Sequence, residues 1–87
     1  VFPAVSFEAA EQLLLRDVCA LGIDTLSPDR PEEGFKVHQT FLSASKFLIE
    51  NVTKLADIPA IGAYVLVMPL KIKEGTEAPI RLIALIT

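Results

Sequence analysis

The segment SFEAAEQLLLRDVCALGID, residues 6–24, decides the fold class of this chain. Ser6 is a good helix N-cap, and strong helix formers follow it, with two glutamates near the start where the helix dipole favours them. These features predict a helix over residues 7–16. The apolar run over residues 18–24 then predicts a short buried strand. A helix followed directly by a strand favours an α/β arrangement.

The rest of the chain extends this α/β pattern. Prolines, a glycine and charges mark a loop, helical spacing of apolar residues marks a second helix, and β-rich runs mark three more strands. The loop is expected over residues 25–35 and the second helix over residues 36–45. The three strands are expected over residues 46–52, 63–72 and 80–86. The last two strands are expected to pair as a hairpin across a polar loop. The sequence therefore predicts an α/β fold with two helices packed on a mixed sheet.

Length and composition limit what these residues can do alone. A chain of 87 residues forms one domain at most, yet 52% of it is hydrophobic and its mean hydropathy is +0.49. We therefore expect either a partner surface or a longer parent chain, and a first residue of Val1 rather than Met favours the latter. The longest uncharged stretch, residues 58–70, is broken by Pro and Gly and is shorter than the roughly 20 residues of a membrane helix. No membrane association is expected.

Charge and cysteine content exclude further classes. The net charge is −3 and the basic residues are scattered, so binding to nucleic acid is not expected. The single cysteine, Cys19, cannot form an internal disulfide, which fits a reducing, cytoplasmic compartment. Its apolar neighbours predict that Cys19 is a small core residue.

His38 and Glu50 are the pair of residues that could carry chemistry. From His38 to the end of its helix is about 10 Å, and the four strand steps from Lys46 to Glu50 return about 13 Å. If the chain reverses near Ser45, the two side chains converge. Alternation places the Glu50 carboxylate on an apolar strand face, where it needs a partner, either a divalent metal or a basic side chain.

Simpler interpretations of this pair stay open. A lone histidine on a helix is more often a surface or core residue than a ligand, and a lone glutamate on a strand is more often salt-bridged. A catalytic metal needs about three protein ligands and an open position for water. His38 and Glu50 supply two at most, so residues outside these 87 would have to complete such a site.

The ordered motifs of the chain resemble the cyclase family, whose best-known members are bacterial kynurenine formamidases. GIDTLSPD, residues 22–29, is similar to the family's G-[IV]-D-T-x-S-x-D segment. As in the family, a histidine follows, His38, and twelve residues later a glutamate, Glu50, in the context I-x-E-N. The resemblance continues to the end of the chain through PLKI at residues 69–72 and PIR at residues 79–81.

This resemblance implies a metal-dependent amidohydrolase of arylformamides, as in tryptophan catabolism, or of cyclic amides such as isatin. It implies a swivelling β/β/α fold, zinc or manganese as cofactor, and a homodimer. His38 and Glu50 match metal ligands of the family, and Gly75 and Thr76 match a glycine-rich turn that would contact a small amide substrate. In that turn Glu74 and Glu77 replace glycines, which would alter substrate preference or abolish activity if the turn contacts substrate.

The family's main metal motif, H-x-G-T-H-x-D-x-P-x-H, lies upstream of the part that this chain resembles. Residues 1–87 therefore resemble the C-terminal portion of a single cyclase-like domain, and the N-terminal part of the same protein is the expected partner. The chain would be an enzyme only as part of that longer protein. Two alternatives remain: a non-catalytic α/β binding or structural module, and an unrelated small domain whose apolar strands are buried on oligomerisation.

Overall fold

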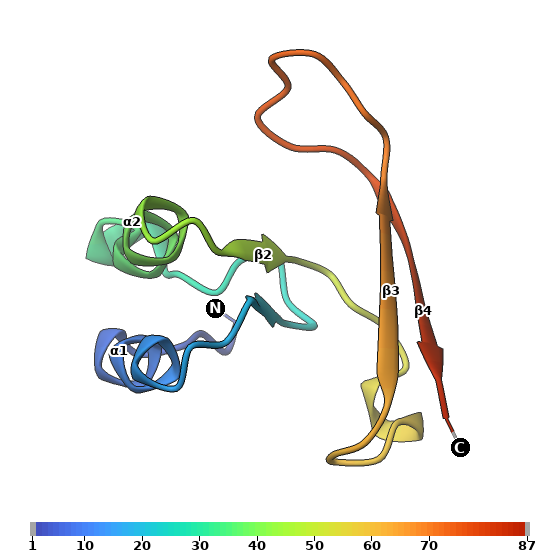
Figure 1. Cartoon of the computed structure of the whole chain (residues 1–87). Coiled ribbons are helices and arrows are strands. Elements are labelled where there is room, and N and C mark those ends of the chain that lie inside the picture. The colour runs from blue at the N-terminus through green and yellow to red at the C-terminus, as the bar shows by residue number, and fades with distance from the viewer. Residues whose placement is uncertain (1, 87) are drawn as a thin grey trace. The chain divides into compact units, whose positions relative to one another are not determined.

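The computed structural model describes residues 2–86, which form two compact units, unit 1 up to Thr53 and unit 2 from Lys54. Unit 1 contains two helices, a short 3-10 helix and two strands, and unit 2 contains a 3-10 helix and two strands (Figure 1). In chain order the elements of unit 1 are α1 (Phe7–Leu15), β1 (Ala20–Gly22), η1 (Pro31–Glu33), α2 (Lys36–Ser43) and β2 (Phe47–Ile49). The elements of unit 2 are η2 (Leu55–Asp57), β3 (Tyr64–Pro69) and β4 (Ile80–Leu85).

The core of unit 1 lies between its two helices. Ala10 of α1 and Val37 and Phe41 of α2 are fully buried, and partly buried apolar residues from both helices and both strands pack around them. As the sequence predicts, the Ser6 hydroxyl caps α1 by accepting a hydrogen bond from the Ala9 N–H at 3.1 Å. Apolar side chains of both helices and of both strands thus form one small core in unit 1.

Strands β1 and β2 pair in parallel, and α2 lies between them in the chain. The ladder aligns Ala20 with Phe47 and Gly22 with Ile49. It continues past both strands through a hydrogen bond from the Val52 N–H to the Ile23 carbonyl at 3.0 Å. The connection through α2 is what brings the end of β2 next to the start of that helix.

Both helices of unit 1 end in the same way. After α2, Ser45 takes a left-handed conformation with φ 63°, and the Lys46 N–H bonds the Phe41 carbonyl at 3.0 Å. After α1, Asp17 has φ 53°, and the Val18 N–H bonds the Leu13 carbonyl at 3.4 Å. This six-residue closure is the Schellman motif, which turns the chain sharply at a helix end. The chain therefore reverses direction near Ser45, as the predicted convergence of His38 and Glu50 requires.

Unit 2 is built on a β-hairpin. Strands β3 and β4 pair antiparallel from Tyr64 with Leu85 to Pro69 with Ile80, as predicted for the last two strands. Pro69 stands at the end of β3, where the lack of an N–H is tolerated. Among residues 54–86, as far as the structure describes them, none is buried.

The α/β class is confirmed, with one difference in the sheet. Parallel and antiparallel pairs both occur, but in two separate two-stranded sheets rather than one mixed sheet. Beyond β2, Asn51 with φ 57° leaves the extended conformation, which ends the strand before unit 2 begins.

The prediction that Cys19 is a core residue is wrong, because Cys19 is exposed. It stands just before β1 and outside the cluster that the two helices enclose. The assignment of residues 1–87 to one portion of a larger domain stays a prediction. No helix within residues 2–86 has the length and apolar character needed to cross a membrane.

Candidate functional site

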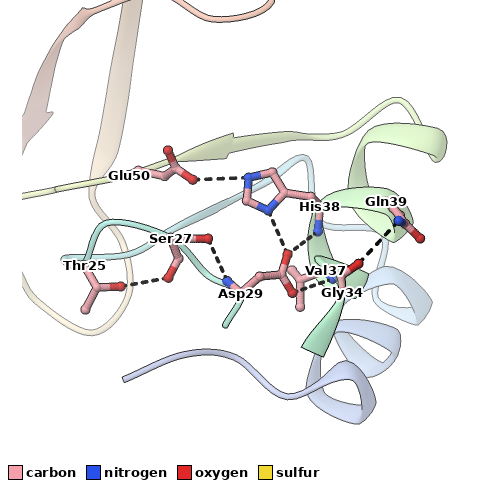
Figure 2. A network of polar contacts seen from close by, with 8 residues as sticks. All are labelled: Thr25, Ser27, Asp29, Gly34, Val37, His38, Gln39 and Glu50. Carbon is pink, nitrogen blue, oxygen red and sulfur yellow. Dashed lines mark hydrogen bonds and ion pairs between the residues drawn. The ribbon is translucent and has the colours of Figure 1, made fainter. Parts of the chain in front are cut away.

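His38 and Glu50 meet in unit 1. His38 is the third residue of α2 and Glu50 directly follows β2, so the parallel connection through α2 brings them together. The His38 Nε2 atom lies 3.3 Å from Oε2 of Glu50, and each side chain is 28% exposed (Figure 2). The predicted convergence of these two side chains is confirmed. Both remain within reach of a small ligand.

Asp29 contacts the other side of the same imidazole. Its Oδ2 lies 2.7 Å from the ring Nδ1 of His38 and accepts the His38 backbone N–H, also at 2.7 Å. Its Oδ1 accepts the Val37 N–H at 2.8 Å. The Asp29 carboxylate therefore caps the N-terminus of α2 and contacts the ring that this helix carries (Figure 2).

The environment of Asp29 favours its ionised form. Asp29 is only 4% exposed, and this burial by itself would raise the pKa of the carboxyl group. Hydrogen bonds from the Val37 N–H, the His38 ring and the His38 N–H act in the opposite direction, and the net result is a lowered pKa for Asp29. An ionised carboxylate only accepts hydrogen bonds, so the proton between the two groups belongs to His38 Nδ1.

The loop that holds Asp29 is fixed by its own hydrogen bonds. The buried Ser27 hydroxyl accepts the Asp29 N–H at 3.0 Å, and the Thr25 hydroxyl lies 3.0 Å from the Ser27 carbonyl. Asp29 matches a position of the family motif in the sequence, but its contact with His38 was not predicted. Asp24, another position of that motif, is exposed.

Phe35 also touches the His38 ring. The two ring centroids are 5.7 Å apart and the planes are at 86°, an edge-to-face contact. Phe35 has φ 56°, an uncommon left-handed conformation for a bulky residue, and directly precedes α2. The imidazole of His38 is thus contacted by a carboxylate at each nitrogen and by an aromatic ring.

Gly75 and Thr76 lie in the connection between β3 and β4, in unit 2, and both are exposed. A hydrogen bond from the Gly75 N–H to the Ile72 carbonyl at 3.1 Å closes a turn there. A side chain at position 75 would approach Ile72 atoms to 3.1 Å, so the turn favours glycine. The role of Gly75 and Thr76 in substrate binding stays a prediction.

The donor set of His38 and Glu50 suits a divalent metal. An imidazole nitrogen and a carboxylate oxygen bound to one tetrahedral zinc are about 3.4 Å apart, given bonds of about 2.0–2.2 Å. The observed separation of His38 Nε2 and Glu50 Oε2 is 3.3 Å. Within residues 2–86, no group of three or more His, Cys, Asp or Glu side chains could hold a metal ion. His38 and Glu50 are therefore suited to supply two ligands of such an ion but not a complete set.

The chain is similar to isatin hydrolase from Roseibium aggregatum, with 30% identity over 89 residues. The similarity covers 97% of this chain but 34% of that protein, so the chain spans about a third of the length of its relative. No family model matches the chain. The similarity supports a distant relationship to a protein of this kind.

Proposed function

We propose that this chain forms part of a metal-dependent hydrolase of amide bonds. In this proposal His38 and Glu50 are two ligands of a zinc or manganese ion, and the remaining ligands come from residues outside these 87. The observation that supports it best is the 3.3 Å separation of His38 Nε2 and Glu50 Oε2. The similarity to isatin hydrolase supports it independently.

A metal at this position would polarise the substrate carbonyl and lower the pKa of a bound water toward about 7. The residues of this chain have simpler tasks. His38 would bind through its Nε2 lone pair, and Glu50 would bind through a carboxylate oxygen while offsetting part of the positive charge. Because both side chains are partly exposed, the pair can face a substrate that approaches from solvent or from another segment of the protein.

The proposed substrates are small amides of two kinds. Cyclic amides come first because the relative is an isatin hydrolase. Arylformamides such as N-formylkynurenine come second, on the resemblance of the motifs to the cyclase family. The acidic turn that contains Glu74 and Glu77 would disfavour anionic substrates if it contacts them.

The proposal is tested on protein expressed from its complete coding sequence and supplied with zinc or manganese. We expect close to one bound metal ion per His38 and Glu50 pair and hydrolysis of isatin, followed by absorbance. His38→Ala and Glu50→Gln should each reduce activity by more than about 100-fold, because even outer partners of a metal ligand contribute 10–100-fold. His38→Ala should also reduce the metal content.

Two matched controls use exposed neighbours of the same unit. Gln39→Ala changes the next residue of α2, and Glu33→Gln neutralises an exposed carboxylate on η1. Both variants should keep the metal and the activity. Wild-type protein without bound metal, or His38→Ala protein that keeps it, would instead favour the non-catalytic α/β module. A coding sequence without a histidine- and aspartate-containing motif upstream would point the same way.

A further inference from the structure

We propose that Asp29 is a positioning residue that holds the neutral His38 ring in one tautomer, with its Nε2 lone pair directed at Glu50. Only the consequence for metal binding rests on the proposed function. The tautomer itself is a property of the protein without metal. The inference starts from the contacts of the Asp29 carboxylate, which the motif alone does not explain.

A single oxygen of Asp29 fixes His38 at two points. Its Oδ2 accepts the backbone N–H of His38 at 2.7 Å and lies 2.7 Å from the ring Nδ1 of the same residue. Holding the backbone and the ring of one residue on one atom restricts both side-chain torsions of His38. The ring plane is further limited by the edge-to-face contact with Phe35 at 5.7 Å.

Asp29 is itself held in place by hydrogen bonds that do not involve the His38 ring. Its N–H donates to the Ser27 hydroxyl at 3.0 Å, and its other carboxylate oxygen accepts the Val37 N–H at 2.8 Å. Both Ser27 and Asp29 are buried, at 8% and 4% exposure. The carboxylate is therefore a fixed acceptor rather than a mobile surface group.

The chemical consequence follows from the hydrogen-bonding capacity of each group. A neutral imidazole has one N–H and one lone pair, and a carboxylate can only accept. A carboxylate faces each ring nitrogen, and the single proton of a neutral ring goes to the shorter contact, 2.7 Å between Nδ1 and Asp29, which leaves the lone pair on Nε2, 3.3 Å from Glu50 Oε2. A histidine that binds a metal needs this lone pair, and a hydrogen bond from its other nitrogen to a carboxylate makes it a better ligand.

Replacing Asp29 by asparagine should move the ring proton of neutral His38 from Nδ1 to Nε2. With the amide oxygen accepting the Val37 N–H, the NH₂ group takes the place of Oδ2 and can donate to Nδ1, while the bond from the His38 backbone N–H is lost, so α2 retains part of its cap. The ring proton then moves to Nε2 and points at Glu50. The matched control is Glu33→Gln, which also replaces a carboxylate by an amide, but at an exposed position of the same unit that makes no contact with His38.

The experiment is nitrogen NMR of metal-free protein expressed from its complete coding sequence, with labelled histidine, at a pH where the ring is neutral. The signals of His38 are those missing from a His38→Gln variant. Wild-type protein and Glu33→Gln should show the proton on Nδ1, and Asp29→Asn should show it on Nε2. Titration with zinc should give about 10–100-fold weaker binding for Asp29→Asn and unchanged binding for Glu33→Gln.

An Nε2-protonated neutral ring in wild-type protein would overturn the assignment, and this measurement stands even if Asp29→Asn does not fold. An unchanged tautomer in a folded Asp29→Asn protein whose Val37 amide remains hydrogen-bonded would also overturn it. If the tautomer changes as expected but wild-type protein binds no zinc, Asp29 keeps its role and the proposed function fails. If zinc binds equally to both proteins and the tautomer is unchanged, the role of Asp29 fails and the proposed function stands.

Discussion

At the scale of single residues, Asp29 is the position that sequence rules could not place. An N-cap is expected directly before a helix, and the residue before α2 is Phe35, which has no side-chain oxygen. Asp29 reaches the helix from 8 residues upstream of Val37. It can do so because Gly34 and Phe35, with φ 85° and 56°, turn the chain into α2. His38 and Glu50, in contrast, could be paired from strand and helix lengths alone.

The lowered pKa of Asp29 predicts a pH-dependent contribution to stability. With its folded pKa below the ordinary value of 3.8, Asp29 stabilises the folded state above that value, and this stability is lost as the pH falls through the folded pKa. Asp29→Asn should therefore lower the free energy of unfolding by about 1–3 kcal/mol at neutral pH. The difference between the two proteins should shrink below about pH 4.

Urea unfolding at several pH values measures this difference in the free energy of unfolding. The pair of proteins is compared in a His38→Gln background, so that the imidazole adds no titration of its own. The bonds from the Val37 N–H and from the N–H at position 38 remain in that background, and both act to lower the pKa of Asp29. A difference that stays constant from neutral pH down to the acid range would contradict the explanation.

At the scale of elements, the helices were easier to predict than the strands. The helix expected over residues 7–16 is observed as Phe7–Leu15. It could be predicted because its cap and its apolar face are formed by residues that are close together in the sequence. The strand expected over residues 18–24 is shortened to Ala20–Gly22. Strand length and partner depend on pairing with distant segments, and period-two patterns do not specify that pairing. The separation into two sheets follows from the same cause.

The left-handed residue after α2 offers a test of how the helix end is stabilised. Ser45 has φ 63°, and its side chain is exposed. Glycine takes this conformation without the cost that other residues incur, about 1–2 kcal/mol, although it also increases the entropy of the unfolded chain. Ser45→Gly should therefore raise the free energy of unfolding by about 0.5–1 kcal/mol in urea titrations. Ser45→Val, with its branched side chain, should lower it.

The equivalent position after α1 provides the control for Ser45→Gly. Asp17 has φ 53°, but its carboxylate lies 2.7 Å from the Lys46 Nζ atom. The lysine lowers the pKa of Asp17, which shows that the contact favours the charged form. Asp17→Gly relieves the same backbone cost and removes this ion pair, so its gain should be smaller than that of Ser45→Gly. An equal gain would mean that the ion pair contributes nothing to stability, and no gain in either variant would contradict the explanation from backbone conformation.

At the scale of the whole molecule, the two units differ in how they bury apolar side chains. All three fully buried core residues, Ala10, Val37 and Phe41, belong to unit 1. In unit 2 the hairpin leaves large apolar residues of both strands exposed, including Tyr64 at 72% and Leu85 at 51%. A two-stranded hairpin with no further layer is marginally stable at best in water. Unit 1 can thus organise the His38 site from its own contacts, whereas unit 2 needs additional surface.

This difference predicts how the 87 residues behave when made alone. Backbone amides of β3 and β4 should exchange with solvent almost as fast as an unfolded chain, while those of α2 around Val37 and Phe41 should be protected. In protein from the complete coding sequence, the proposed additional residues should cover the hairpin and slow its exchange. Hydrogen exchange followed by NMR or mass spectrometry, together with sizing of the isolated chain, measures both. A discrete, folded oligomer of the 87 residues with protected hairpin amides would instead support the small oligomerising domain, since self-association would then supply the missing layer.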